Sequence, residues 1–229
     1  MDLISHTPKY KELFPDKRLE KRASMIAHSL LMSKTASVHG ATKDEAEQKG
    51  FYRFLENERV TEDILIQELV NRCCKNVVNR DVIVIQDSTS FGLNHNAKNI
   101  KPHSGAGFVG NKKGIGFLSH CSLVIDAHSE AMLGFSDVQL WHRTEDKANN
   151  TTKAYKKQGI EEKESYKWIK ASRQSKELLS SAKSITIIED REGDIYEQFG
   201  MIPDEKTQLL IRNRDNRRLN DGTRLHEAL

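Results

Sequence analysis

The chain of 229 residues has few cysteines and lacks any long apolar run. Its three cysteines, Cys73, Cys74 and Cys121, are odd in number and lack the paired spacing of a zinc site, so we interpret them as reduced thiols. No apolar stretch approaches the ~20 residues that a membrane-spanning helix needs, and the N-terminus carries no apolar signal region. These absences predict an intracellular protein with no membrane partner.

Acidic residues are absent from a long central span, Ser88 to Ile125, which holds four lysines and three histidines. The stretch from Lys206 to Arg224 is also basic, although the net charge of the whole chain is only +3. Local basic patches suit a polyanion such as DNA, but an ordinary solvated surface explains each of them equally well. The candidates to line a DNA channel are Lys112, Lys113, Arg212 and Arg214.

Residues 1–80 carry the apolar periodicity of three helices. Asp16 can cap a first helix, in which apolar residues recur every three or four positions. Thr42 and Glu45 form a capping-box pattern for a second helix, and Thr61 can cap a third. Basic residues crowd the first turns of the first helix: Lys17, Arg18, Lys21 and Arg22. The pattern predicts either a small DNA-binding module or a plain helical cap on the domain that follows.

Residues 81–229 mix strands with helices, which predicts an α/β (α+β) domain. Three strand patterns come first, and the last two are joined by a turn that is too short for a crossover, so they are antiparallel. A helix, a strand, a helix and a strand follow. The predicted elements are strands at 82–86, 117–126, 130–140, 185–190 and 208–212, helices at 160–182 and 195–199, and a loop or hairpin connection at 88–116. This order is that of the beginning of a ribonuclease-H-like mixed sheet.

Two of the predicted strands end on an aspartate, Asp87 in DVIVIQD and Asp190 in SITIIED. Carboxylates at the carboxyl ends of buried strands lie where α/β sheets place their chemistry. Mg²⁺ prefers oxygen ligands and usually takes only one or two protein carboxylates. Two such ions ~3.5–4 Å apart support an in-line displacement at phosphorus. We therefore interpret Asp87 and Asp190 as candidate catalytic residues and ligands of Mg²⁺, with Mn²⁺ as a substitute.

Other acids compete for these roles, and strand-end aspartates also cap helices and turns without any catalytic function. Alternation places Glu189 on the face of the sheet opposite to Asp190. Asp194 is placed to cap the next helix, and Asp126 is predicted to belong to a turn. The serines that follow Asp87 lack the glycines of a nucleophile elbow, so serine-hydrolase chemistry is not predicted.

Five segments match the motifs of a known family, in the family's order and at roughly its spacing. They are DKRLEKR (16–22), FYRFLEN (51–57), QDSTSFG (86–92), EKESYKW (162–168) and EDREGDIYE (189–197). On these segments the chain resembles the DDE transposases of bacterial insertion sequences, in the insertion-sequence-four family. The resemblance is strongest to the branch that contains the transposon-five transposase.

The resemblance implies a helical domain at 1–80 that binds the transposon end and a ribonuclease-H-like catalytic domain at 81–229. Asp87 stands where the family has its first catalytic aspartate, and Asp190 where it has its second. The end-binding residues that it implies are Arg53 together with Lys17, Arg18 and Arg22 of the basic first helix. The family cuts DNA by metal-assisted hydrolysis at the element's ends, after which the freed 3′ hydroxyl attacks other phosphodiesters. The implied partners are double-stranded DNA and, in the complete protein, a second copy of the chain, in the bacterial cytoplasm at the nucleoid.

The family's third catalytic carboxylate is a glutamate in a tyrosine–arginine–glutamate helix motif, well past the second aspartate. No Y-x-x-R-x-x-x-E pattern follows Asp190 in this sequence. We therefore expect a truncated form or fragment of such a transposase, with an incomplete catalytic domain and little strand transfer. Two alternatives are an inactive DNA-binding fragment that occupies transposon ends or inhibits a full-length enzyme, and a host nuclease of the same fold.

Overall fold

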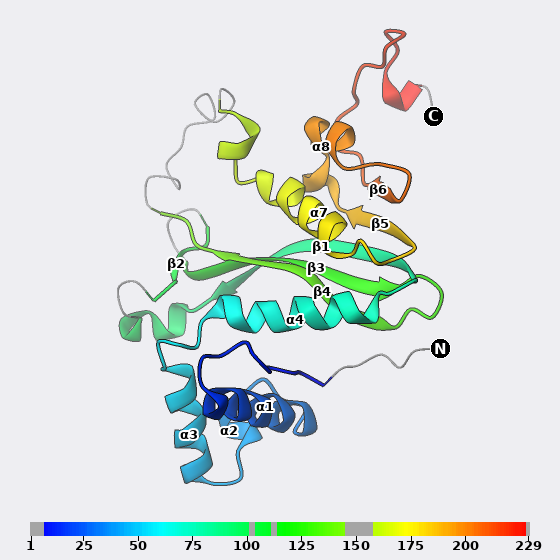
Figure 1. Cartoon of the computed structure of the whole chain (residues 1–229). Coiled ribbons are helices and arrows are strands. Elements are labelled where there is room, and N and C mark those ends of the chain that lie inside the picture. The colour runs from blue at the N-terminus through cyan, green and yellow to red at the C-terminus, as the bar shows by residue number, and fades with distance from the viewer. Residues whose placement is uncertain (1–6, 101–103, 111–113, 145–157, 228–229) are drawn as a thin grey trace. The chain divides into compact units, whose positions relative to one another are not determined.

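The computed structural model describes residues 7–100, 104–110, 114–144 and 158–227. By its internal contacts the chain divides into two compact units, Met1–Asn76 and Val77–Leu229. Figure 1 shows the elements of both units, and each unit is described by itself below.

The first unit contains only helices among its described residues. They are α1 (Lys17–Met32), α2 (Val38–Ala41), α3 (Glu45–Leu55) and α4 (Glu62–Asn76). Phe14, Phe51 and Phe54 are buried and form the centre of the core that α1 and α3 share. The three predicted helices are confirmed as α1, α3 and α4, whereas the short α2 has no counterpart in the prediction.

Side-chain caps begin α1 and α4 where the sequence predicts them. The Asp16 carboxylate accepts the backbone N–H of Arg18 at 2.8 Å. The hydroxyl of Thr61 accepts the N–H of Ile64 at 3.4 Å. Both caps satisfy N–H groups that have no partner inside the helix.

The predicted capping box of α3 is wrong by two residues. Asp44, not Thr42, accepts the first free N–H group, that of Glu47, at 2.8 Å. The Glu47 carboxylate in turn accepts the N–H of Lys43 at 2.8 Å. A carboxylate one residue before the helix is a charged acceptor at the positive end of the helix dipole, so it displaces the threonine cap.

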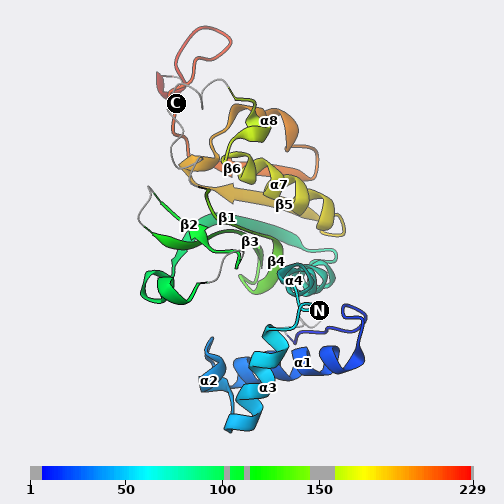
Figure 2. The same cartoon turned by 90° about the vertical axis from the view of Figure 1, so that its left-hand side faces the viewer.

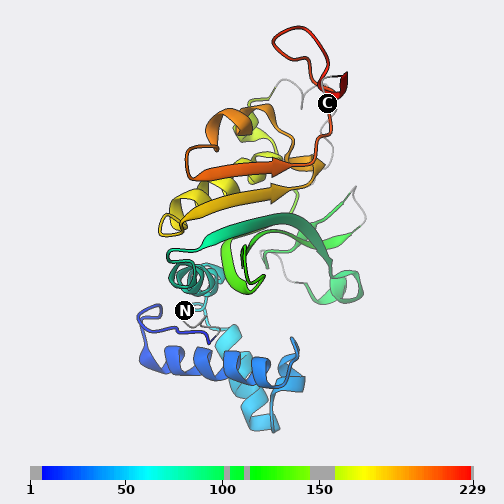
Figure 3. The same cartoon turned by 90° about the vertical axis from the view of Figure 1, so that its right-hand side faces the viewer.

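The second unit is built on one mixed sheet. Its strands are β1 (Asp81–Gly92), β2 (Gly107–Phe108), β3 (Ile115–Asp126), β4 (Met132–Trp141), β5 (Ser184–Glu189) and β6 (Thr207–Ile211). The order is β2-β3-β1-β5-β6, and β4 pairs with β3 on a separate branch. The pairs that β3 makes with β1, β2 and β4 are antiparallel, whereas β1–β5 and β5–β6 are parallel. In Figure 3 the orange β6 lies beside the yellow β5, and β5 lies beside the teal β1.

The first strand is longer than predicted. β1 does not stop at Gln86 but continues to Gly92, and its second half pairs with β3 from Ser88 opposite His120 to Gly92 opposite Gly116. The prediction of a loop from residue 88 is therefore wrong for residues 88–92. These residues have few apolar side chains, and the long partner strand β3 supplies the backbone hydrogen bonds that hold them extended.

Helix α7 (Tyr166–Leu178) covers one face of the sheet, where it packs against β4, β3 and β1 (Figures 1 and 2). A short helix, α8 (Tyr196–Met201), follows β5. The remaining helical turns are η1 (Asn94–Asn99), η2 (Ile160–Glu162), η3 (Arg191–Gly193) and η4 (Leu225–Glu227). Every second residue of β5 is buried, namely Ile185, Ile187 and Glu189. The two faces of the sheet therefore end in different surroundings.

None of the helices in the described parts of the chain has the length and apolar character that crossing a membrane would require.

Candidate active site

The two predicted aspartates lie at corresponding places on neighbouring strands. The parallel register of β1 and β5 ends with Ile85 opposite Ile188, and Asp87 and Asp190 each follow that pair by two residues. Since side chains alternate along a strand, both carboxylates belong to the face that carries Ile85 and Ile188. Both aspartates are exposed. Asp87 lies within β1 rather than at its end, because the strand continues along β3.

Each of these carboxylates uses one oxygen in a local hydrogen bond. Asp87 Oδ1 accepts the N–H of Ser88 at 2.8 Å, and Asp190 Oδ1 accepts the N–H of Glu192 at 2.7 Å. Within the described residues, neither Oδ2 atom takes part in a hydrogen bond or an ion pair. Two exposed carboxylates with a free oxygen each fit the hard, oxygen-preferring Mg²⁺, which takes one or two protein carboxylates and completes its shell with water or phosphate.

A cluster of three or more histidine, cysteine or acidic side chains that could hold a metal does not occur in the part of the chain that the structure describes. Asp87 and Asp190 remain the two candidate ligands.

Glu189 lies on the covered face, as the alternation predicts. Its side chain is buried, and its two oxygens accept hydrogen bonds from Ser172 Oγ at 2.8 Å and Gln198 Nε2 at 2.5 Å. Burial, with a smaller contribution from the charge of Asp190, raises the pKa of Glu189 to about 7 despite these two donors. Position 193 requires a glycine, because a Cβ there would overlap the Glu189 carboxylate.

Glu189 is part of a buried polar chain, by which we mean the buried His120, Gln86, Ser172, Glu189 and Gln198 together with the half-buried Ser88. Ser172 Oγ accepts from Gln86 Nε2 at 2.9 Å. Gln86 Oε1 is 3.2 Å from His120 Nε2, and His120 Nδ1 is 2.9 Å from Ser88 Oγ. Burial, together with the charge of Lys167, lowers the pKa of His120 to about 4. The neutral imidazole can therefore donate to Gln86 and accept from Ser88.

The buried polar chain has no counterpart in the sequence prediction. The available signal is that Gln86 occupies the buried phase of β1 after Val82 and Val84, where an apolar residue is expected. Ser172 likewise lies among the apolar positions of α7. Buried polar groups at such positions need partners, but only the fold shows which ones they find.

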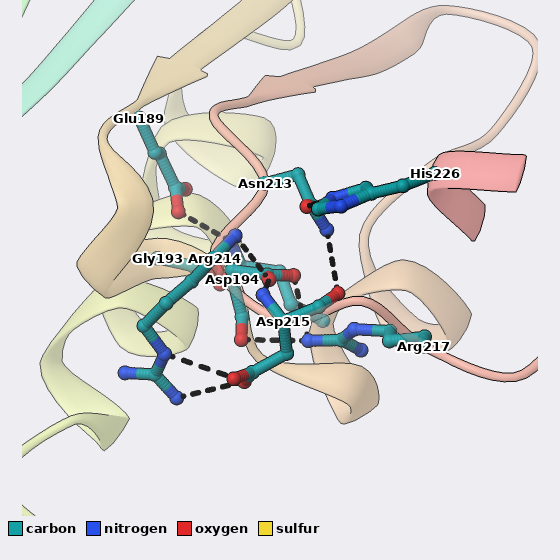
Figure 4. Close-up of polar contacts among 9 residues, drawn as sticks. Glu189, Gly193, Asp194, Asn213, Arg214, Asp215, Arg217 and His226 are labelled. Atoms are coloured by element: carbon teal, nitrogen blue, oxygen red, sulfur yellow. Dashed lines mark hydrogen bonds and ion pairs between the residues drawn. The ribbon is translucent and has the colours of Figure 1, made fainter. Parts of the chain in front are cut away.

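Asp194 is not a helix cap, and that prediction is wrong. Its buried carboxylate accepts the backbone N–H groups of Arg214 at 2.8 Å and Asp215 at 3.1 Å and binds the Arg217 guanidinium at 2.6 Å (Figure 4). Helix α8 begins without a side-chain cap, after Ile195. Asp194 ties the segment after β6 to the end of β5, because a charged guanidinium and two N–H groups satisfy it better than the first turn of a six-residue helix.

Asp126 belongs to a turn, as predicted. Its Oδ1 accepts the N–H groups of His128 at 3.0 Å and Ser129 at 2.8 Å, and its Oδ2 pairs with Arg80 at 2.9 Å. These bonds hold the pKa of Asp126 well below its ordinary value. Asp126 is thus fully engaged in the β3–β4 connection.

The EKESYKW segment supports the covered face. Glu164 forms a two-bond ion pair with Arg143 at 2.7 and 2.8 Å. Trp168 is buried and meets His120 edge-on, with ring centroids 4.5 Å apart. This motif therefore packs against the buried polar chain rather than standing alone on the surface.

The four basic candidates of the helical unit differ in their surroundings. Lys17 and Arg53 are exposed, and within the described residues neither forms an ion pair. Arg18 is bound by Asp16, with Nη2–Oδ2 at 2.9 Å, which lowers the pKa of Asp16. Arg22 is half-buried, and its guanidinium lies against Gly50 of α3. Lys17 and Arg53 are thus the freest of the four to meet a ligand.

The basic candidates of the second unit are divided as well. Arg212 is exposed, whereas Arg214 pairs with Asp215 at 3.3 Å. Lys112 and Lys113 lie outside the described residues. The Asp194 anchor places Arg212 and Arg214 just after the strand that neighbours β5.

Comparison with known proteins yields a family match and distant structural neighbours. Residues 12–60 match the family model described as transposase DNA-binding. This match supports a transposase-related DNA-binding role for the helical unit. No curated protein sequence matches the chain.

The solved structures that match this chain include a piggyBac transposase synaptic complex with hairpin DNA. The similarity has a TM-score of 0.41 and 10% sequence identity, and it covers 88% of this chain. The chain spans 42% of the length of that transposase.

Proposed function

We propose that the chain is a DDE transposase, or part of one, of the bacterial insertion-sequence-four family, nearest to the branch of the transposon-five transposase. The observation that carries this proposal is the placement of Asp87 and Asp190 at matching positions of adjacent parallel strands, each exposed with one carboxylate oxygen free. The match of residues 12–60 to the transposase DNA-binding model supports it independently.

The sheet supports a ribonuclease-H-like assignment for the second unit. Three long strands, β4, β3 and β1, pair in antiparallel fashion, and β5 and β6 add to the β1 edge in parallel. Helix α7 precedes β5 and lies against the antiparallel strands. These features support the ribonuclease-H-like assignment, which the order of the predicted elements also favours.

Asp87 and Asp190 would hold Mg²⁺, or Mn²⁺ in its place. The bound ions would activate the attacking oxygen and stabilise the leaving oxygen in hydrolysis and transesterification at phosphorus. The protein's part is to present two exposed carboxylates on one face of the sheet, just beyond the last backbone pair of β1 and β5. The reaction is cleavage at the ends of the element, followed by joining to target DNA.

Exposed cations would hold the DNA. Lys17 and Arg53 of the helical unit are free to contact phosphates at the terminal repeat, and Arg212 is free to do so in the second unit. Contacts of this kind release counterions and make binding weaken as salt rises. We also propose that the active form of the complete protein is a homodimer on double-stranded DNA at the bacterial nucleoid.

The test measures Mn²⁺ binding and DNA cleavage together. We expect the chain to bind Mn²⁺ with an affinity that falls at least 100-fold in Asp87→Asn and Asp190→Asn. The matched control is Asp63→Asn, which removes an exposed acid from α4 of the helical unit and should leave the affinity unchanged. In the complete protein, cleavage of DNA carrying the inverted repeats that flank the gene should depend on the same two aspartates. Cleavage that survives both substitutions contradicts the proposal.

A second candidate function is DNA binding without catalysis. It is favoured by the family match, which covers only the DNA-binding segment of residues 12–60. Such a protein would occupy transposon ends or inhibit an active transposase. Sequence-specific, salt-sensitive binding to the terminal repeat, with no Mn²⁺ binding that depends on Asp87, would identify it.

A further inference from the structure

The backbone ladder between β1 and β5 stops just before the two aspartates. Its last pair is Ile85 opposite Ile188. The next residues in the same register are Gln86 and Glu189, followed by Asp87 and Asp190. On their outer sides the strands stay paired, β1 with β3 and β5 with β6. Between β1 and β5, beyond Ile85 and Ile188, no backbone pair joins the two strands in the described part of the chain; we call this stretch the seam between β1 and β5. Side chains must link the strands there.

A single hydroxyl of α7 supplies that link. Ser172 Oγ accepts from Gln86 Nε2 at 2.9 Å and donates to Glu189 Oε1 at 2.8 Å. Gln86 and Glu189 are the first pair beyond the ladder, so the bridge begins where the backbone hydrogen bonds end. All three side chains are buried, and Ser172 has no exposed surface at all. Water does not compete for these bonds, and a satisfied buried network is rigid.

The outer ends of the bridge are fixed as well. Gln86 Oε1 meets His120 Nε2 at 3.2 Å, and His120 Nδ1 meets Ser88 Oγ at 2.9 Å. Because Gln86 Nε2 is directed at Ser172, its Oε1 can only accept, so His120 carries its proton on Nε2. At the other end Gln198 Nε2 donates to Glu189 Oε2 at 2.5 Å. The donors thus converge on Glu189 from both sides.

We propose that Ser172 is a positioning residue, whose hydroxyl holds Gln86 and Glu189 together and thereby sets the spacing of Asp87 and Asp190. The inference rests on the proposed function for the roles of the two aspartates. The mechanical part, that one hydroxyl holds two strand ends, rests on the hydrogen bonds alone.

The same helix offers a matched control. Ser175 lies one turn further along α7, is equally buried, and hydrogen-bonds Ser136 of β4 at 2.8 Å. Ser175→Ala removes a buried hydroxyl that links α7 to the sheet, as Ser172→Ala does. It does not touch the seam between β1 and β5. A general effect of losing a buried hydroxyl appears in both variants, and a positioning effect only in one.

The experiment compares wild type, Ser172→Ala and Ser175→Ala in two measurements on the full chain. Hydrogen exchange follows the backbone amides of Gln86 to Ser88 and of Glu189 to Glu192. Electron paramagnetic resonance follows the binding of Mn²⁺. We expect Ser172→Ala to speed exchange of these amides about tenfold and to weaken Mn²⁺ binding about tenfold. Ser175→Ala should leave both within twofold of wild type. If Ser172→Ala does not fold, Gln86→Met breaks the same bridge from the β1 side with little change in volume.

The outcomes separate the two levels of the proposal. Equal behaviour of the Ser172 and Ser175 variants in amide exchange overturns the positioning role. Loss of Mn²⁺ affinity without faster exchange also overturns it, since the effect would not pass through the strand ends. If wild type shows no Mn²⁺ binding that Asp87→Asn abolishes, the proposed function fails, and the exchange measurement alone still tests the bridge.

Discussion

The end of β5 sets two kinds of carboxylate side by side. Glu189 and Asp190 are consecutive, but Glu189 is 3% exposed and bound by two donors on the face that α7 covers, whereas Asp190 is exposed with one oxygen free. Asp194, four residues on, is again buried and bound to Arg217. Acids that are satisfied hold the structure together, and acids that are left open are available for a ligand.

The difference follows from the pleat and from desolvation. A one-residue step along a strand moves a side chain to the opposite face. A buried carboxylate costs free energy unless donors satisfy it, which explains why Glu189 and Asp194 each accept more than one hydrogen bond. An exposed carboxylate such as Asp190 keeps its hydration and can exchange water for a cation. Four predictions test this division, beginning with the largest effect.

The largest effect is expected from the open carboxylates. Asp190→Asn should lower DNA cleavage by the complete protein at least 1000-fold, and yet shift the free energy of unfolding by less than about 0.5 kcal/mol, as exposed substitutions usually do. Urea denaturation together with a cleavage assay checks both parts. A stability loss of several kcal/mol would show that Asp190 belongs to the structural class instead.

Asp194→Asn should show the opposite behaviour. The substitution leaves the half-buried Arg217 guanidinium without its counter-charge, and removing one partner of a buried pair costs about 3–5 kcal/mol of stability. Urea denaturation measures the loss, and Asp215→Asn, whose carboxylate is exposed, is the control. Asp194 would not be an anchor if both variants were equally stable.

The buried polar chain should respond to pH in two opposing ways. Glu189 has a folded pKa of about 7 against an ordinary value of 4.5, so the folded chain keeps a proton that the unfolded chain releases, and stability falls as pH rises through this window. His120 has a folded pKa of about 4 against 6.5, so the unfolded chain gains a proton that the folded chain refuses, and stability falls as pH drops from 6.5 towards 4.

The two contributions are of similar size, about 3 kcal/mol each, and partly cancel in wild type. Glu189→Gln should leave only the contribution of His120, so that stability increases as pH rises from 4 to 6.5. His120→Gln should leave only the contribution of Glu189, so that stability decreases as pH rises from 4.5 to 7. Thermal unfolding across this range checks the sign in each variant. Parallel profiles for the two variants would contradict the assignment.

The smallest effect concerns the basic side chains of the helical unit. Lys17→Ala and Arg53→Ala should each weaken binding to the terminal repeat a few-fold and lower the slope of log K against log salt by about 1. Arg18→Ala should change the slope less, because Asp16 already neutralises that guanidinium. Binding titrations at several salt concentrations measure the slope. Equal slopes for all three variants would show that the free and paired cations do not differ.

Local patterns in the sequence predicted a large part of this structure. The caps at Asp16 and Thr61, the strand alternation that separates Glu189 from Asp190, and the turn at Asp126 depend on residues within a few positions of one another. Such features follow from the chemistry of the chain itself, because the partner is nearby whatever the fold. The choice of Asp87 and Asp190 as candidates had the same origin, in two strands that each carry an acid after an apolar run.

Only the tertiary structure determined the features that depend on partners far away in the sequence. The prediction of a helix cap at Asp194 is wrong because the donors that satisfy its carboxylate lie 20 to 23 residues away, at Arg214 to Arg217. β1 was predicted too short because its extension depends on pairing with β3. In the bridge from Gln86 through Ser172 to Glu189, Ser172 lies 86 positions from Gln86 and 17 positions from Glu189. Composition and periodicity by themselves determined most of the elements and the candidate acids. Packing determined which of these acids are buried and hydrogen-bonded and which stay exposed. The reason is that desolvation depends on neighbours that only the folded chain brings together.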